Sequence, residues 1–261
     1  MRKLPITLMH VIVPETVGWP VPGLQSGFAE SQEQNARDIL ERAHKTVQSY
    51  ASDVAVRTEI RRDGVGKALV DASRDAYLTV VGTRGMGALG RTILGSVGSV
   101  LVHYGYGPIA IVPADDIEAP DTAPVLLGID GSPASEEATA LAFDEASRRG
   151  VELVALHAWS DIGAYFTLGM DWRKFEDEGR EVLGERLAGW QERYPDVKVR
   201  RRIVCNQPAH KLIEESRQTQ LLIVGTHGRS GVAGRLGSVS TAVTRQPRVP
   251  TIVVRPRQDQ K

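Results

Sequence analysis

The chain has 261 residues, 41% of them apolar and 25% charged, a composition typical of soluble globular proteins and a length that suits two domains. Its 32 lysines and arginines balance its 32 aspartates and glutamates, so no bulk charge favours a nucleic acid or an anionic membrane as partner. No apolar run approaches the roughly 18 residues of a membrane span. The single cysteine, Cys205, excludes an internal disulfide, and we expect a cytoplasmic protein.

The first 114 residues predict strands that alternate with helices. An apolar strand at Leu8–Val11 is followed by a long amphipathic helix, a strand, a short helix and an apolar strand that ends at Gly82. A glycine-rich loop, a helix that opens at Gly95-Ser96 and a last strand at Ile109–Val112 complete the series. This order favours parallel pairing of the strands.

A segment rich in proline and acidic residues follows, between Pro113 and Pro124. It is poor in bulky apolar side chains, which is typical of a linker. We therefore predict a first domain at residues 1–114, a linker at 115–123 and a second domain at 124–261.

The second domain repeats the first, and we call the two the first copy and the second copy. Residues 203–216 match 60–73 at an offset of 143, and 155–158 match 8–11 at an offset of 147. The strands predicted in the second copy are Val125–Asp130, Leu153–Ala158, Val197–Val204, Leu221–Gly225 and Thr251–Val254. They lack the alternation of half-solvated strands, so helices should cover both faces of the sheet. We predict an α/β fold of two tandem doubly wound parallel sheets.

The first copy has no counterpart of about 24 residues, Pro124 to Ser147, which hold the first strand and helix of the second copy. That strand is normally central, so its two neighbours in the first copy would keep unpaired ladder groups, which cost about 1–3 kcal/mol each if buried. Two explanations stay open. The sequence starts inside a longer reading frame, or the first copy is a degenerate half that is completed by rearranged pairing or by a second chain.

The most informative repeat is a glycine-rich turn. Val80–Gly85 and Ile223–Gly228 each end an apolar strand in glycines, and each is followed by a Gly-Ser pair, at 95–96 and 237–238. A Gly-Ser pair that opens a helix offers N–H groups and a hydroxyl to phosphate oxygens at the positive end of the helix dipole. The alternative is that the glycines only make loops and Ser238 only caps a helix. Duplication at the carboxyl end of a strand favours nucleotide binding.

Asp130 follows the first strand of the second copy and should reach the same edge of the sheet. Its carboxylate has two interpretations, an acceptor for adenine or ribose and the N-cap of a helix that starts near Pro133. His10 and His157 lie at matching strand positions, and we expect packed, hydrogen-bonded side chains there.

His227 is predicted to contact ligand rather than to catalyse, because its counterpart is Arg84, a permanent cation. The chain has no Gly-x-x-x-x-Gly-Lys-Ser/Thr, His-Glu-x-x-His or Cys-x-x-Cys motif, and neither glycine turn contains a lysine to clamp a terminal phosphate. We therefore predict a binding protein with no catalytic residue and no metal ligand.

These motifs resemble those of a known family. The turn at 82–96 matches in full the Gly-x2-Gly-x9-Gly-Ser/Thr pattern of ATP-binding universal stress proteins, and the turn at 225–238 has eight residues in place of nine. With Gly128–Ser132 and the order of strands, the chain resembles a tandem universal stress protein of the actinobacterial type over nearly its whole length. The resemblance implies a five-stranded parallel sheet in each complete domain, a first domain that begins at its second strand, and ATP, with or without Mg, at the carboxyl edge.

The nucleotide contacts that the resemblance implies in the second copy are Gly128, Ile129, Asp130, Ala158, Gly225, His227, Gly228, Arg229, Gly237, Ser238, Val239 and Ser240. In the first copy they are Val11, Gly82, Arg84, Gly85, Gly95, Ser96 and Val97. Family members commonly pair through the last strand, here Ile109–Val112 and Thr251–Val254, which implies an intrachain pseudo-dimer or a homodimer.

The leading hypothesis is an ATP-binding stress-response protein that acts as a nucleotide-dependent sensor or regulator without efficient catalysis, with regulatory protein partners that the sequence does not identify. Two alternatives stay open, a nucleotide-independent interaction module and a slow ATP hydrolase.

Overall fold

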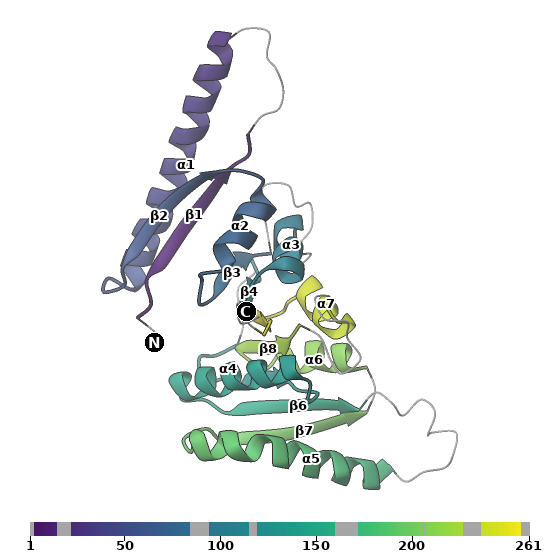
Figure 1. Ribbon diagram of the computed structural model, residues 1–261. Helices are drawn as coiled ribbons and strands as arrows, with labels where there is room; N and C mark the ends of the chain where they lie inside the picture. The colour runs from purple at the N-terminus through teal and green to yellow at the C-terminus, as the bar shows by residue number, and fades with distance from the viewer. Residues whose placement is uncertain are drawn as a thin grey trace. The chain divides into compact units, whose positions relative to one another are not determined.

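The computed structural model describes residues 3–14, 22–83, 94–114, 119–159, 172–205, 207–226 and 236–256. Strands and helices alternate along the chain (Figure 1), which confirms the predicted α/β fold. The chain forms two compact units, Met1–Ala72 and Ser73–Lys261, called here the amino-terminal and carboxy-terminal units. Within the described ranges, no helix combines the length and apolarity needed to cross a membrane.

The amino-terminal unit is a parallel strand pair covered by a long helix. Its elements are β1 (Ile6–Ile12), α1 (Pro22–Tyr50), β2 (Val56–Arg62) and α2 (Val65–Ser73). β1 and β2 pair in parallel over their full length, from Ile6 beside Val56 onward. α1 connects the two strands and packs on both, with Ala36 and Leu40 buried on its inner face. This is the strand–helix–strand crossover that the sequence predicts.

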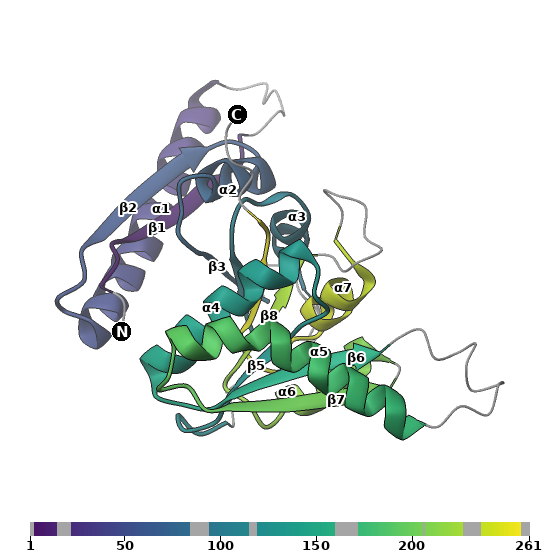
Figure 2. The same ribbon diagram turned by 60° about the horizontal axis from the view of Figure 1, so that its bottom comes forward.

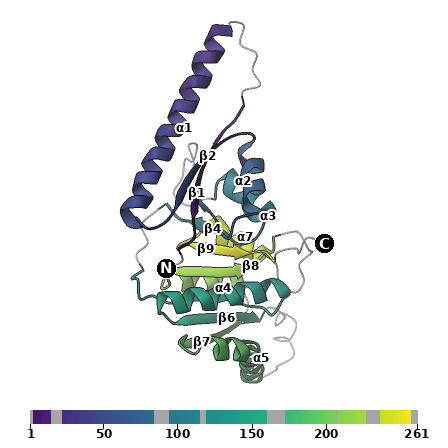
Figure 3. The same ribbon diagram turned by 60° about the vertical axis from the view of Figure 1, so that its left-hand side comes forward.

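The carboxy-terminal unit contains one sheet of seven strands. Its elements are β3 (Thr79–Gly82), α3 (Ser96–Tyr104), β4 (Ile109–Val112), β5 (Val125–Gly128), α4 (Pro133–Arg149), β6 (Leu153–Trp159), α5 (Trp172–Arg193), β7 (Val199–Cys205), α6 (Pro208–Ser216), β8 (Leu221–Gly225), α7 (Ser238–Arg245) and β9 (Thr251–Val254). The strand order is β3-β4-β9-β8-β5-β6-β7. Figure 3 shows β4, β9, β8, β6 and β7 stacked in this sequence.

The second copy supplies five parallel strands with its first strand, β5, in the centre, as predicted. Leu127 on β5 lies beside Ala155 on β6 and beside Ile223 on β8. α4 and α5 lie next to each other on one face (Figure 2), where the rings of Phe143 and Trp190 stack 6.0 Å apart, while α6 and α7 pack together on the other. Helices on both faces explain why these strands read as continuous apolar runs.

The last strands of the two copies join in the middle of this sheet. β4 and β9 pair antiparallel, with Ile109 beside Val253 and Ile111 beside Thr251. This is the intrachain pairing that the resemblance implies. Arg255, just after β9, donates hydrogen bonds to the carbonyls of Val102 (3.3 Å) and His103 (2.7 Å) at the end of α3. Burial lowers the pKa of the Arg255 guanidinium.

The four strands of the first copy are divided between two sheets. β1 and β2 form a two-stranded sheet of their own, whereas β3 and β4 belong to the seven-stranded one. In the second copy β5 pairs with both β6 and β8. The counterparts of those two strands are β1 and β3, and within the described ranges neither has such a neighbour. The division falls at the place where the missing first strand was expected.

Candidate functional site

The ends of three neighbouring strands form one edge of the second copy. Gly128 at the end of β5 lies beside Leu156 on β6 and beside Val224 on β8. The structure therefore brings several of the predicted contacts to this carboxyl edge, where open α/β sheets bind ligands. These are Gly128, Ile129, Asp130, Ala158, Gly225 and the start of α7 at residues 237–240. His227, Gly228 and Arg229 lie outside the described residues.

Gly128 lies in a tightly packed position. A Cβ at this position would lie 3.0 Å from Val224 Cγ1 and 3.1 Å from Leu212 Cδ1 on α6. Both distances are tighter than ordinary carbon contacts, so the absent side chain lets α6 close on the end of β5. The role of Gly128 visible in the structure is to shape the edge of the sheet.

The first turn of α7 begins without a side-chain cap. Gly237 is the N-cap, with an extended backbone (φ −69°, ψ 161°) and no side-chain cap. The first helical hydrogen bond runs from the Thr241 N–H to the Gly237 carbonyl at 2.9 Å, so the N–H groups of residues 238–240 have no partner inside the helix. Ser238 is exposed. Three amides and a hydroxyl at the positive end of the helix dipole suit an anion.

Two hydrogen bonds hold this turn against the end of β8. The buried Ser240 hydroxyl donates to the Gly225 carbonyl at 2.6 Å, and the Gly237 N–H donates to the Thr226 carbonyl at 2.7 Å. Thr226 is 1% exposed and is not among the predicted contacts. The available signal was its repetition, because Thr83 occupies the same place in the first turn and is also buried.

The start of α4 at the same edge is closed by its own side chains. The Ser135 N–H donates to Ser132 Oγ at 3.2 Å, the Ser132 N–H to Asp130 Oδ1 at 2.9 Å and the Gly131 N–H to Ser135 Oγ at 3.0 Å. The N-cap is therefore Ser132, and the interpretation of Asp130 as N-cap is wrong. Pro133 at the first helical position places the cap one residue before it. The two helix starts at this edge therefore differ, because side chains occupy the amides that lead into α4, whereas α7 has no side-chain cap.

The main-chain N–H and carbonyl of Ile129 both form hydrogen bonds. Its N–H donates to the Leu156 carbonyl at 3.0 Å, and its carbonyl lies 2.7 Å from Nδ1 of His157. Because a carbonyl only accepts, Nδ1 carries the proton in this contact. His157 is 7% exposed, which confirms the expectation of a packed, hydrogen-bonded histidine.

In the first copy, α3 starts at a glycine as α7 does, but it lacks the serine hydroxyl that bonds the start of α7 to the end of β8. Gly95 is an extended N-cap (φ −64°, ψ 168°) without a side-chain cap, and Ser96 is exposed. Gly98 occupies the position of Ser240, so the bond to the end of the strand has no equivalent. A Cβ at Gly98 would lie 2.3 Å from Leu94 Cδ1, so an alanine there would displace the end of the Leu94 side chain. Arg84 and Gly85 lie outside the described residues.

The remaining predicted residues of the first copy belong to two units. Val11 is on β1 in the amino-terminal unit, whereas Gly82 at the end of β3 and Val97 in the first turn of α3 belong to the carboxy-terminal unit. The carboxy-terminal unit by itself therefore contains the strand end and the helix start of the first glycine turn.

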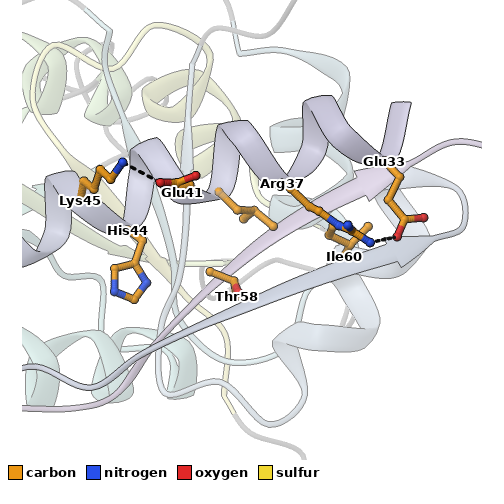
Figure 4. A pocket seen from close by; sticks show the side chains of 8 residues that line it. Glu33, Arg37, Glu41, His44, Lys45, Thr58 and Ile60 are labelled. Atoms are coloured by element: carbon orange, nitrogen blue, oxygen red, sulfur yellow. Dashed lines mark hydrogen bonds and ion pairs between the residues drawn. The ribbon is translucent and has the colours of Figure 1, made fainter. Parts of the chain in front are cut away.

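An open pocket of about 690 Å³ lies between α1 and β2 in the amino-terminal unit (Figure 4). Its charged side chains pair with others nearby, Glu33 with Arg37 at 2.7 Å and also with Arg62, and Glu41 with Lys45 at 2.6 Å. The hydrogen bond from Arg37, followed by that from Arg62, lowers the pKa of the Glu33 carboxyl. None of the predicted nucleotide contacts lines this pocket.

Fold and site together define a tandem α/β protein in which the helices after β3 and β8 each start at a glycine N-cap without a side-chain cap. The model of the universal stress protein family matches residues 1–113 and 122–255. The chain therefore belongs to the universal stress protein family and contains two tandem domains of it.

Full-length relatives agree with this assignment. A universal stress protein of Mycolicibacterium smegmatis is 55% identical over 262 residues, which cover 98% of this chain and 89% of that protein. Two universal stress proteins of Mycobacterium tuberculosis are 46% and 45% identical, each alignment covering 98% of this chain and 88% of the relative. The crystal structure of a universal stress protein from Archaeoglobus fulgidus aligns with a TM-score of 0.69 at 19% identity, covering 96% of this chain and 88% of that one, which supports the fold.

Proposed function

We propose that this stress-response protein binds ATP in its second copy and acts as a nucleotide-dependent sensor or regulator. The observation that carries the proposal is the contrast between two helix starts at one sheet edge. The amides that lead into α4 are occupied by Ser132, Asp130 and Ser135, whereas the first turn of α7 has no side-chain cap. A polyphosphate supplies the acceptors that such a turn lacks.

The proposed arrangement follows the order of the strands. The phosphates lie against the amides of residues 238–240, and the ribose and base lie toward the ends of β5 and β6, where Asp130 and Ala158 are placed. Asp130 Oδ1 already accepts from the Ser132 N–H, which fixes the orientation of the carboxylate. An oriented acceptor suits a ribose hydroxyl or an adenine amino group.

The test is calorimetric titration of the full chain with ATP, with and without Mg, using two substitutions at Ser238. Ser238→Glu places a negative charge at the exposed first position of α7, where it complements the helix dipole but repels phosphate. We expect its ATP affinity to fall about tenfold or more, since like charges at close range cost at least about 1.4 kcal/mol in a partly desolvated site.

Ser238→Thr, which keeps the hydroxyl, serves as the matched control and should bind like the parent chain. Folding is checked by thermal denaturation, in which the glutamate variant should melt at or slightly above the parent temperature. Equal ATP affinity for the glutamate and threonine variants, or no heat with ATP for the parent chain, would contradict the proposal. A homodimer and regulatory protein partners stay part of the same proposal, with sedimentation as the measurement of assembly.

A further inference from the structure

Arg186 on α5 contacts the turn at residues 129–132, which joins β5 to α4. Its Nη1 donates to the Gly131 carbonyl at 3.0 Å. Gly131 has a φ of +78°, a backbone conformation that favours glycine, and a Cβ there would lie 2.3 Å from both Cζ and Nη1 of Arg186. The guanidinium therefore occupies the space in which any other residue would place its side chain.

A second contact from the same face of α5 holds the start of α4. Trp190 lies four residues after Arg186, so the two side chains share one face of the helix. The Trp190 Nε1 donates to Oε1 of Glu136, in the first turn of α4, at 2.8 Å. α4 and α5 run beside each other (Figure 2), and α5 thus contacts both the turn that precedes α4 and the beginning of that helix.

α5 itself is fixed on the sheet. Leu183 and Leu187 are 2% and 0% exposed and belong to the hydrophobic core. On the side of β7, Nη2 of Arg201 donates to Oε1 of Gln191 at 2.8 Å. A donor carried by an anchored helix can define the position of the carbonyl that it contacts.

The carbonyl that Arg186 contacts belongs to the peptide group that holds Asp130. The Gly131 carbonyl and the Ser132 N–H are the two polar groups of one planar peptide unit. The carbonyl accepts from Arg186, and the N–H donates to Asp130 Oδ1 at 2.9 Å. Because the unit is rigid, the direction of its N–H follows from the direction of its carbonyl, and the two hydrogen bonds polarise each other. One peptide group therefore connects the guanidinium to the carboxylate.

We propose that Arg186 is a positioning residue for the nucleotide. Through the peptide group of Gly131 and Ser132, it holds the Asp130 carboxylate in the orientation that receives a ribose hydroxyl or an adenine amino group. This role rests on the proposed function, in which Asp130 meets the nucleoside and the start of α7 meets the phosphates. Arg186 therefore affects binding of the nucleoside end of the ligand and leaves binding of the phosphate end unchanged.

The first test needs no nucleotide. Amide hydrogen exchange of the full chain, read by mass spectrometry, reports on the segment 129–135. We expect Arg186→Gln to speed exchange there about threefold or more, because the turn loses its donor from α5. Arg186→Lys keeps a cation that can donate one hydrogen bond to the Gly131 carbonyl and should restore part of the protection. Glu185→Gln, at the neighbouring exposed position of α5, is the control and should leave exchange unchanged.

The second test is calorimetric titration with ATP and with AMP. Arg186→Gln should weaken both nucleotides by the same factor, about three- to tenfold, because they share the nucleoside. Ser238→Glu should instead weaken ATP more than AMP, since ATP carries more phosphate charge. In an Asp130→Ala chain, Arg186→Gln should cause no further loss of affinity, because the carboxylate through which it acts is absent. A general loss of structure would not produce this dependence on Asp130.

The outcomes separate this role from ATP binding itself. Unchanged exchange at 129–135 or unchanged ATP affinity in Arg186→Gln would overturn the positioning role and leave the proposed function in place. So would a loss of affinity from Arg186→Gln that is as large in the Asp130→Ala chain as in the parent. Absence of binding of ATP and AMP by the parent chain would overturn both proposals.

Discussion

The Ser240 hydroxyl donates a 2.6 Å hydrogen bond to the main-chain carbonyl of Gly225 and so ties the first turn of α7 to the end of β8. Ser240→Ala leaves that carbonyl without its donor, and we expect the free energy of unfolding to fall by about 1–2 kcal/mol. Urea unfolding measures the change. Ser238→Ala, at an exposed position two residues earlier, should change it by less than about 0.5 kcal/mol. Equal effects at the two serines would contradict this role of Ser240.

Two glycines of the first copy give a matched pair for the same measurement. A Cβ at Gly95 meets only the Thr83 carbonyl at 3.8 Å, and the backbone is one that alanine adopts freely, so Gly95→Ala should be nearly neutral. A Cβ at Gly105, the C-cap of α3, meets the main-chain carbonyl of Leu101 at 2.6 Å and Ile109 Cδ1 at 2.9 Å. We expect Gly105→Ala to destabilise by about 1–3 kcal/mol through overpacking. Thermal denaturation of both variants measures the change in stability. A larger loss of stability for Gly95→Ala than for the other variant would refute the packing argument.

The junction of the two copies should be sensitive to charge. Ala110 on β4 pairs with Ile252 on β9, and each is 5% exposed. Ala110→Asp would bury a carboxylate between the last strands, and we expect a loss of about 3 kcal/mol or more in the free energy of unfolding. Tyr104→Asp introduces the same charge at a 68% exposed position and should have little effect. Similar denaturation midpoints for both variants would show that β4–β9 pairing contributes little to stability.

Acid should weaken the amino-terminal unit through Glu33. Hydrogen bonds from Arg37 and Arg62 hold the pKa of its carboxyl below the usual 4.5. Because the folded pKa is the lower one, the ionised carboxylate stabilises the fold fully above about pH 4.5, and this stabilisation is lost as the pH falls through the folded value. Glu33→Gln should flatten this part of the pH dependence, measured as hydrogen exchange of α1 and β2.

Glu30, exposed on the same helix, provides the control, and Glu30→Gln should leave the acid dependence of the parent chain unchanged. Since Glu33 is partly solvated, added salt should also reduce the effect. If hydrogen exchange in α1 and β2 keeps its acid dependence in Glu33→Gln, another carboxylate causes that dependence.

The sequence predicts strand positions well because a short apolar run between two helical segments fits few structures other than a buried strand. The observed β8 and β9 have the predicted bounds, and β5 ends at Gly128 rather than Asp130 because the loop that leads into α4 begins there. The cap of α4 was less predictable, since Asp130 and Ser132 are both good caps and only the path of the chain decides between them. The direction of the Ser240 side chain depends on how α7 packs against β8, which the spacing of motifs does not reveal.

The antiparallel pairing of β4 with β9 separates the carboxyl ends of β3 and β8. β3 runs parallel to β4, and β8 runs parallel to β9, so the two pairs of strands point in opposite directions within one sheet. β3 and β8 therefore end at opposite rims of that sheet. The Leu94 N–H, just before α3, donates to the Arg245 carbonyl at the end of α7 (3.2 Å), so the segment that leads into α3 contacts α7 directly, in addition to the strands that lie between.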